Sequence, residues 1–194
     1  MAQALKKTSY HHGNLKEALV ETALEMLKTL KPDDLSLRKL AGQLGVSQTA
    51  VYSHFKDKTA LIAAIAAHGF HDQARYMTDR IRDIKDPYLR LEEIAVAYMQ
   101  FAFDNRALFQ VMFSRDVQDL PEHAELSLNA GKPYSLFAAA WSRYRPDHAH
   151  QMPFIWSMIH GQTVLMCDPK FGPAMSRGLS PKDLAQKSIQ VFKG

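Results

Sequence analysis

Apolar residues recur at three- and four-residue spacing through almost the whole chain, and this periodicity most limits the folds it can adopt. Such spacing places apolar side chains on one face of an α-helix, whereas a half-buried strand requires strict alternation. Beyond residue 87 no strand-like alternation occurs. The pattern predicts an all-α fold with about nine helices, over residues 14–30, 36–44, 48–55, 58–82, 88–105, 106–114, 121–144, 146–167 and 181–192.

Local signals indicate where some of these helices begin, end or bend. Asn14 and Glu17 have the spacing of a capping box, which satisfies two free backbone amides at a helix start. The first helix is expected to end before Pro32, because a residue that precedes proline avoids the helical region. Pro133 is expected to bend the helix over residues 121–144.

Two short helical segments flank a glycine in the N-terminal part. Ser36 and Ser47 are candidate N-caps, and Gly45 follows the last apolar residue of the first segment, where a left-handed conformation is favoured. Val51 and Phe55 give the second segment an inner face. The arrangement describes a helix-turn-helix, whose second helix enters the major groove in DNA-binding proteins. A generic pair of packed helices would show the same apolar pattern.

The outward side of the second segment suits contact with DNA. Its side chains are short or polar, and none is acidic: Gln48, Thr49, Ala50, Tyr52, Ser53 and His54. Amides, hydroxyls and methyl groups suit base edges and phosphates. Lys56 and Lys58 follow directly, at the start of the next helix, where free backbone amides also favour phosphate.

The basic excess of the chain is concentrated around this motif. The whole chain has 24 Lys+Arg against 20 Asp+Glu, which gives a formal net charge of +4. Residues 1–58 account for a net charge of +3, and the remaining residues for a net charge of +1. This distribution is compatible with nucleic-acid binding, and also with an ordinary solvated surface.

Two stretches of the motif carry a specific pattern, LRKLAGQLGVS at residues 37–47 and VYSHFKDKTAL at residues 51–61. Together they resemble the TetR family of transcriptional regulators, and the resemblance covers roughly residues 10–61. A shorter likeness lies in the second half, where Trp156, His160 and Gly161 resemble the Trp-x-x-x-His-Gly (WHG) motif of one C-terminal domain type in this family.

The resemblance implies an all-α homodimer with two domains. Residues 1–57 would form a three-helix DNA-binding domain, and residues 58–194 a helical domain for ligand binding and dimerisation. The residues implied to contact DNA are Arg38, Ser47, Gln48, Thr49, Ala50, Tyr52, His54, Lys56 and Lys58. Each has a structural alternative, such as a half-exposed aromatic, a turn residue or a solvated charge.

The resemblance also implies that the last two long helices form a four-helix dimer interface. By this analogy residues 147–166 and 181–192 meet the same helices of a second subunit. Their apolar residues would then be partly intermolecular, for example Ile155, Ile159, Leu184, Ile189 and Val191. The alternative is a monomeric core.

The chain beyond residue 85 is rich in aromatic and methionine side chains, which suit either an ordinary helical core or an apolar chamber with a few polar groups. The candidate ligand-binding residues are Tyr98, Met99, Phe103, Phe109, Met112, Phe113, Phe137, Trp141, Trp156 and His160. Tyr98, His160, Gln162 and Arg106 are the candidate polar groups. For any single residue among them, the core alternative stays open.

Several function classes find no support in the sequence. No nucleophile-elbow, P-loop, zinc-protease or dinucleotide-binding pattern occurs. The single cysteine, Cys167, excludes an internal disulfide and is expected to be an inert buried thiol. The nine histidines lack partners at metal-ligand spacing, so neither a metal nor a cofactor is expected. With no hydrophobic leader and no membrane-length apolar run, a cytoplasmic protein without membrane contact is expected.

These patterns predict a ligand-responsive transcriptional regulator, more specifically a repressor. It would bind a pseudo-palindromic double-stranded DNA operator as a homodimer and be released by an unidentified small-molecule effector. The alternative is a helical small-molecule binding protein or enzyme without DNA function. The two hypotheses differ in whether the protein shows salt-dependent DNA affinity.

Overall fold

The computed structural model describes residues 15–118 and 124–193, and these residues form helices and no strand. This confirms the predicted all-α fold. The helices are α1 (Leu15–Leu27), η1 (Pro32–Asp34), α2 (Leu37–Leu44), α3 (Gln48–Tyr52), α4 (Lys58–Arg80), α5 (Pro87–Asp104), α6 (Arg106–Met112), α7 (Arg115–Gln118), α8 (Ala124–Ala130), α9 (Lys132–Tyr144), η2 (Pro146–Gln151), α10 (Met152–Cys167), α11 (Gly172–Ser176) and α12 (Pro181–Gln190), where η marks a 3₁₀-helix.

Side-chain caps and one glycine define the ends of the short N-terminal helices. The hydroxyl oxygen of Ser36 accepts a hydrogen bond from the backbone N–H of Lys39 at 3.2 Å, and Ser47 accepts one from Ala50 at 3.1 Å. Gly45 has a φ of 72°, in the left-handed region that favours glycine. Both predicted caps and the predicted turn are therefore confirmed.

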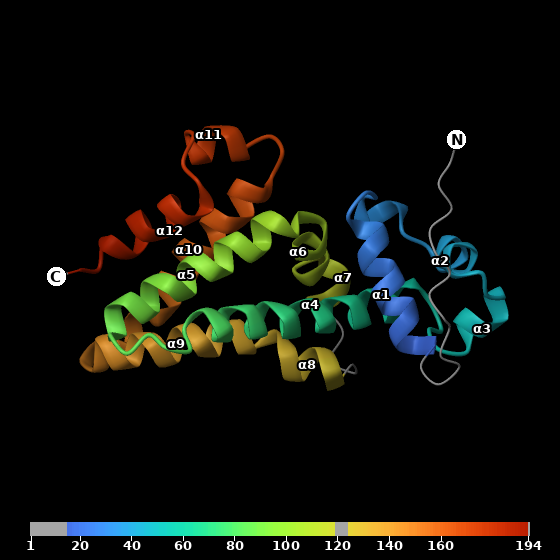
Figure 1. Cartoon of the computed structure of the whole chain (residues 1–194), viewed down its shortest axis with the longest axis horizontal. Helices are drawn as coiled ribbons and strands as arrows, with labels where there is room; N and C mark the ends of the chain where they lie inside the picture. The colour runs from blue at the N-terminus through green and yellow to red at the C-terminus, as the bar shows by residue number, and fades with distance from the viewer. Residues whose placement is uncertain (1–14, 119–123, 194) are drawn as a thin grey trace.

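The long helix α4 joins the N-terminal helices to the rest of the molecule. Asp57 caps it by accepting a hydrogen bond from the backbone N–H of Ala60 at 2.8 Å. Leu61 and Ile65 in its first half pack into the core around α1, α2 and α3, whereas Met77 packs into the core around α5, α9 and α10. Figure 1 shows α4 running lengthwise between the two groups. One rigid helix is thus part of both hydrophobic cores.

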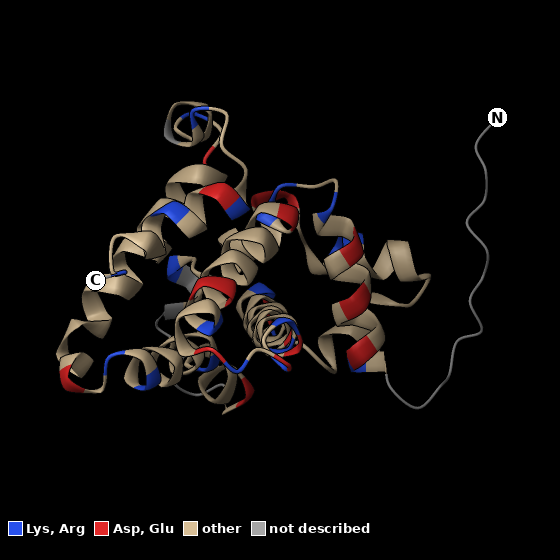
Figure 2. Cartoon of the chain, turned by 60° about the vertical axis from the view of Figure 1, so that its left-hand side comes forward, with Lys and Arg blue, Asp and Glu red and all other residues tan. Residues whose placement is uncertain are grey.

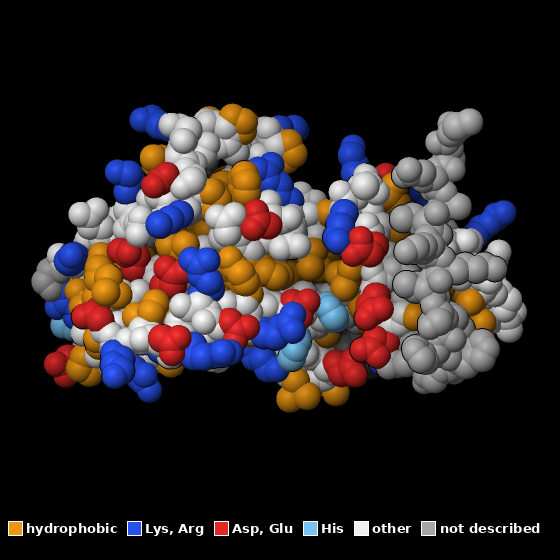
Figure 3. All heavy atoms as spheres, viewed as in Figure 1, with side chains coloured by type: hydrophobic (Ala, Val, Ile, Leu, Met, Phe, Trp, Pro, Cys, Tyr) orange, Lys and Arg blue, Asp and Glu red, His pale blue; other side chains and the backbone are white. Residues whose placement is uncertain are grey.

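Helix α5 is the central helix of the C-terminal part. It packs against α4, α9, α10 and α12, and residues 94–99 are all buried. Basic and acidic side chains alternate over the face of these helices seen in Figure 3. This mixture agrees with the near-neutral charge of the chain beyond residue 58.

The structure differs from the predicted helices where prolines begin new ones. Residues 124–144 form α8 and α9 with Gly131 between them, and Pro133 lies in the first turn of α9 instead of bending a single helix. The predicted helix over residues 146–167 is divided into η2 and α10, each with a proline in its first turn. Proline is tolerated there because its missing N–H has no partner in a first turn.

Two sequence predictions concern residues outside the described ranges, and two observed helices were not predicted. Asn14, the first predicted cap, and the predicted helix start at Pro121 lie outside the described residues. The short helices α7 and α11 are not predicted by the periodicity. No helix in the described ranges is long and apolar enough to cross a membrane.

Candidate functional site

Helix α3 presents a polar surface at one end of the molecule (Figure 1). Val51 and Phe55 are 0% and 2% exposed and fix α3 to the N-terminal core. On the outside Gln48 and Thr49 are exposed, and Tyr52 is 54% exposed although it is a large aromatic residue. The structure therefore presents an amide, a hydroxyl and a phenol together, the groups that read base edges and bind phosphates.

The other residues predicted to contact DNA differ in their exposure and in the hydrogen bonds that they already make. Arg38 and Lys56 are exposed, and Ala50 is half-buried. Ser47 is exposed, but its hydroxyl already caps α3. His54 is exposed and lines a groove on the side of the domain that faces α1.

Lys58 has a structural contact that the sequence did not indicate. Its ammonium group donates a hydrogen bond to the backbone carbonyl of Asp33 at 3.1 Å, and Lys39 donates one to the carbonyl of Asp34 at 2.8 Å. Two lysines thus tie η1 to α2 and to the start of α4. A phosphate contact by Lys58 stays a prediction, and it would be made by a side chain that is already anchored.

Three of the six acidic residues in residues 1–58 lie on a different helix, α1. Glu17, Glu21 and Glu25 follow one another at four-residue spacing on α1, all exposed, so they share one face (Figure 2). Helix α3 contains no acidic residue. Half of the negative charges that offset the basic excess are thus carried by α1, and the predicted DNA-contacting helix is free of them.

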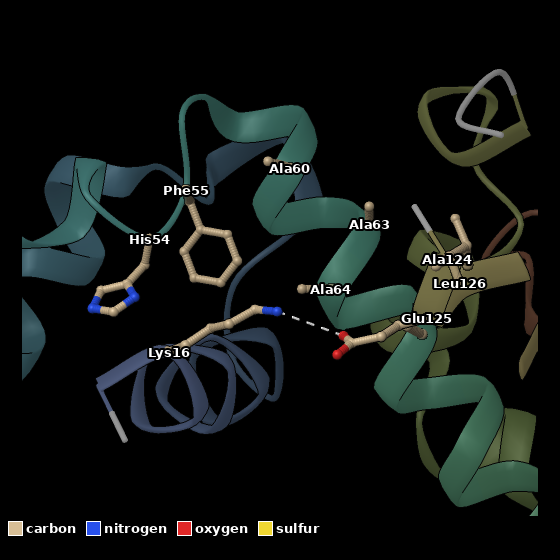
Figure 4. A pocket seen from close by; sticks show the side chains of 10 residues that line it. Lys16, His54, Phe55, Ala60, Ala63, Ala64, Ala124, Glu125 and Leu126 are labelled. Carbon is tan, nitrogen blue, oxygen red and sulfur yellow. Dashed lines mark ion pairs between the residues drawn. The ribbon is translucent and has the colours of Figure 1, made fainter. Parts of the chain in front are cut away.

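A groove of about 310 Å³ separates α1 from α8 (Figure 4). Ala63 and Ala64 of α4 line it, with Lys16 of α1 on one side and Glu125 of α8 on the other. The Lys16 ammonium and the Glu125 carboxylate form an ion pair at 3.6 Å. Both side chains are exposed, so the pair contributes little stability, but it connects the N-terminal helices to the C-terminal part.

Six of the predicted ligand-binding residues form one cluster of rings in the C-terminal part. Trp156 and His160 are stacked with centroids 5.5 Å apart, and the His160 ring lies 4.5 Å from that of Phe113. The ring of Tyr98 meets those of Phe109, Phe137 and Trp156 edge-on at 5.3–5.9 Å. The Tyr98 hydroxyl and His160 Nδ1 share a hydrogen bond of 2.8 Å.

The other four predicted ligand-binding residues lie elsewhere. Trp141 packs on Tyr144 and Phe192, and its indole N–H donates to the carbonyl of His148 at 2.7 Å. Phe103 lies under the guanidinium of Arg106, which is 4.2 Å from the ring centroid. Met99 is buried within α5, and Met112 is buried against Gly69. Of the other candidate polar groups, the side-chain oxygen of Gln162 accepts a hydrogen bond from Ser188 at 2.6 Å.

Burial changes the titration of the polar groups in this region. Burial lowers the pKa of His160 and raises the pKa of Tyr98 well above its ordinary value. Both groups are therefore neutral near pH 7, with the tyrosine hydroxyl as donor and Nδ1 as acceptor. Burial also raises the pKa of Cys167 to about 11, which supports the predicted inert thiol. Among the described residues no group of three or more His, Cys, Asp or Glu side chains could hold a metal ion.

Sequence reasoning missed two polar residues inside the molecule. Gln73 of α4 is 0% exposed, and within the described residues no group pairs with its side-chain oxygen or nitrogen. The hydroxyl of Ser114 is also buried without a described partner. A glutamine at a core position of the α4 periodicity is the signal that could have identified the first of them.

The exposed face of α10 corrects the predicted dimer contacts. Ile155 and Ile159 of α10, and Ile189 of α12, are 0% exposed because they pack within their own chain, so they are not intermolecular. The residues of these helices that do leave apolar surface exposed are Phe154, Val164, Leu165 and Val191. Leu184, also predicted there, is half-buried.

Family comparisons agree with this geometry. A family model described as "Bacterial regulatory proteins, tetR family" matches residues 19–65, and one described as "Tetracyclin repressor-like, C-terminal domain" matches residues 91–192. Among curated proteins, the class C tetracycline repressor of Escherichia coli is 49% identical over 51 residues, which are 26% of this chain and 23% of that protein. The class D repressor of Escherichia coli is 43% identical over 51 residues, again 26% of this chain and 23% of that protein.

Solved structures show the same fold over nearly the whole chain. A protein of unknown function from Rhodococcus sp. RHA1 has a TM-score of 0.79 at 23% identity, covering 96% of this chain and 97% of that one. A TetR variant from Acinetobacter baumannii AYE, in complex with minocycline, has a TM-score of 0.60 at 20% identity, covering 92% and 96%. The TetR family regulator PfmR from Thermus thermophilus has a TM-score of 0.62 at 15% identity, covering 90% and 96%.

Proposed function

Because the chain belongs to the TetR family of bacterial transcriptional regulators, we propose that it represses transcription by binding a pseudo-palindromic operator as a homodimer, and that a small molecule releases it. Family membership makes the chain a DNA-binding regulator and not an enzyme. The observation that carries the finer proposal is the exposed, acid-free face of α3 on a helix that is firmly packed and capped. The WHG subtype of the C-terminal domain stays a prediction.

The short recognition helix requires a second copy. Helix α3 has five residues, so one subunit reaches only a few base pairs. Two copies related by a dyad would place their α3 helices in successive major grooves, about 34 Å apart. The exposed apolar residues Phe154 and Val164 on α10 supply a surface for the second subunit. This geometry supports an operator with two inverted half-sites, read in the cytoplasm where the DNA lies.

Helix α4 is part of both hydrophobic cores, and this position supports release of the DNA by a ligand. A molecule that binds more tightly to one arrangement of the C-terminal core would tilt α4, and with it the helix-turn-helix that α4 carries. Coupling of this kind needs only a difference in affinity between two states, typically about 1–3 kcal/mol. The complexed ligand of the Acinetobacter protein, minocycline, belongs to that protein, and the effector of this chain is a separate question.

The operator contacts can be tested by selecting bound sequences from random DNA. Wild-type protein is expected to select an inverted repeat. Tyr52→Ala and Gln48→Ala are each expected to weaken binding to that repeat in gel shifts by about 1–3 kcal/mol, because each removes a contact to a base or phosphate. Gln110→Ala, an exposed glutamine of α6, is the matched control and is expected to bind as wild type.

The same experiment separates the proposal from a DNA-independent small-molecule binding protein. Phosphate contacts release counterions, so operator affinity is expected to fall steeply between two salt concentrations. A protein that selects no common sequence, or whose α3 variants bind DNA as well as the control, would contradict the proposed interface.

A further inference from the structure

Gln73 has an unusual position for a glutamine. It lies in the middle of α4, its side chain is 0% exposed, and both polar atoms of its amide lack a partner within the described residues. Among the described residues, the other buried polar side chains are satisfied: Thr163 donates to the carbonyl of Ile159, and Ser188 donates to the side-chain oxygen of Gln162. A buried amide without partners costs free energy in every folded molecule. Gln73 thus places a polar amide without a described partner in an apolar interior.

Neighbouring residues place this amide at the contact of α4 with α6. Gly69, Gln73 and Met77 share one face of α4 because they are four residues apart. A Cβ at Gly69 would lie 2.8 Å from the sulfur of Met112 on α6, so the two helices touch one turn before Gln73. One turn after it, Met77 is buried in the core that contains Tyr98. Gln73 therefore lies where the two hydrophobic cores meet.

The aromatic cluster lies beside this position. Phe70, three residues before Gln73, meets the ring of Phe113 edge-on at 5.2 Å, and Phe113 lies 4.5 Å from His160. Ser114, whose hydroxyl is the other buried group without a described partner besides Gln73, directly follows Phe113. Each of the two contacting rings, Phe70 and Phe113, is thus followed within three residues by a buried polar side chain without a described partner.

Only side chains, and no backbone, fill the space beside Gly69 at the contact of α4 with α6. Gly69 has no side chain, and the space that one would occupy is filled by the side chains of Met112 and Leu108. Methionine is unbranched and flexible, and it adapts readily to a changed neighbour. In the proposed bound state, the side chains of Met112 and Leu108 would rotate away from α4 and give a small flat molecule access to the amide of Gln73.

The charges of the interior restrict what such a molecule can be. The buried residues of both cores include no Lys, Arg, Asp or Glu, so a charged group would be desolvated without a counter-ion. A glutamine amide offers an NH₂ group with two donor hydrogens beside a C=O acceptor. A partner that matches it presents the complementary pair, as a primary amide, a lactam or a cyclic imide does.

We infer that Gln73 anchors the effector, and that the effector is an uncharged planar molecule with an adjacent N–H donor and C=O acceptor. The inference rests on the proposed ligand-responsive function, and it specifies the chemistry of that ligand. The amide of Gln73 would fix its polar edge, and Phe113, which packs on Phe70 of the same helix as Gln73, would border its ring.

Three small probes of similar shape test the inference on the full-length protein without DNA. Benzamide carries the donor and acceptor, benzoate carries a charge in their place, and ethylbenzene carries neither. Isothermal titration calorimetry is expected to show that benzamide binds at least about tenfold more tightly than either other probe. The fluorescence of Trp156 is expected to change on the same titration, because that ring is stacked on His160, which lies against Phe113.

The variant Gln73→Met removes the amide and keeps an unbranched side chain of similar length. It is expected to fold, since it removes a buried group without a partner, and to lose the preference for benzamide over ethylbenzene. Gln110→Met, at an exposed position of α6, is expected to keep that preference. Equal binding of all three probes to wild type, no binding of benzamide, or an unchanged preference in Gln73→Met would each overturn the inference.

Operator retention in the presence of benzamide is measured separately. Selective binding that leaves operator binding unchanged would support the anchor and contradict the proposed release mechanism. Loss of operator binding by wild type but not by Gln73→Met would support both.

Discussion

At the scale of single residues, the burial of His160 makes the stability of the fold depend on pH. Its ring is stacked on Trp156 and accepts a hydrogen bond from Tyr98. Burial lowers its pKa from the ordinary value of 6.5, so the unfolded chain takes up a proton at a higher pH than the folded one. The stability from neutral His160 is therefore complete above pH 6.5 and is lost as the pH falls through this value toward the folded pKa.

The variant His160→Asn isolates this contribution, because asparagine keeps an acceptor near the position of Nδ1 but does not titrate. Urea unfolding of both proteins at a series of pH values is expected to give free energies that run parallel above about pH 7. Below about pH 6.5 the wild-type curve is expected to fall more steeply. Parallel curves over the whole range would mean that the ring is protonated as easily inside the protein as outside it.

Single residues also show what the sequence can and cannot predict about a site. The exposed position of Tyr52 is compatible with the helical period once Val51 is placed inside, and the polar Gln48 is exposed at the first position of α3. Gln73 does not follow in the same way, because a glutamine in a helical pattern is normally a surface residue. Gln73 occupies a core position of the α4 period, but the contact of α6 with Gly69, which joins distant segments, is what shows that a polar residue there is interior.

At the scale of helices, α3 depends on its cap because it is only five residues long. The Ser47 hydroxyl accepts a hydrogen bond from the backbone N–H of Ala50, and few other hydrogen bonds hold the first turn. Ser47→Ala is expected to lower the free energy of unfolding by about 1 kcal/mol. Operator affinity is expected to fall with it, since the recognition helix loses its fixed start.

Chemical denaturation followed by circular dichroism measures the first effect, and gel shifts measure the second. Ser135→Ala on the exposed side of α9 is the control, and its free energy of unfolding is expected to stay within about 0.5 kcal/mol of wild type. A Ser47 variant as stable as this control would show that packing of Val51 alone holds α3 in place.

The helices also show which features depend on neighbouring residues in the sequence and which depend on contacts between distant segments. The caps at Ser36, Ser47 and Asp57 were predictable because capping depends on a few neighbouring residues. The buried face of α10 was not, because the helix carries apolar residues on all sides and its period does not distinguish the core from an interface. Ile155 and Phe154 look equivalent in the sequence, yet one is 0% and the other 73% exposed.

At the scale of the whole molecule, the exposed face of α10 should determine whether the protein is a dimer. Phe154, Met158, Gly161 and Leu165 follow one another at three- and four-residue spacing, so they share one face. A Cβ added at Gly161 would meet no atom within 4 Å, so this face is open to a second backbone. Monomeric proteins seldom leave such apolar surface exposed, which points to a second subunit on it.

The double variant Phe154→Glu/Val164→Glu is expected to be monomeric in analytical ultracentrifugation, because it places two like charges on each side of the interface. Its helical content is expected to be unchanged, since both positions are exposed in the single chain. Operator binding is expected to be lost as well, because one five-residue recognition helix contacts too few base pairs to hold the site alone. Leu128→Glu on α8, where the leucine is 72% exposed, adds a comparable charge away from α10 and is expected to leave the dimer and its DNA binding intact. A double variant that still sediments as a dimer would place the interface on another face and separate α10 from operator recognition.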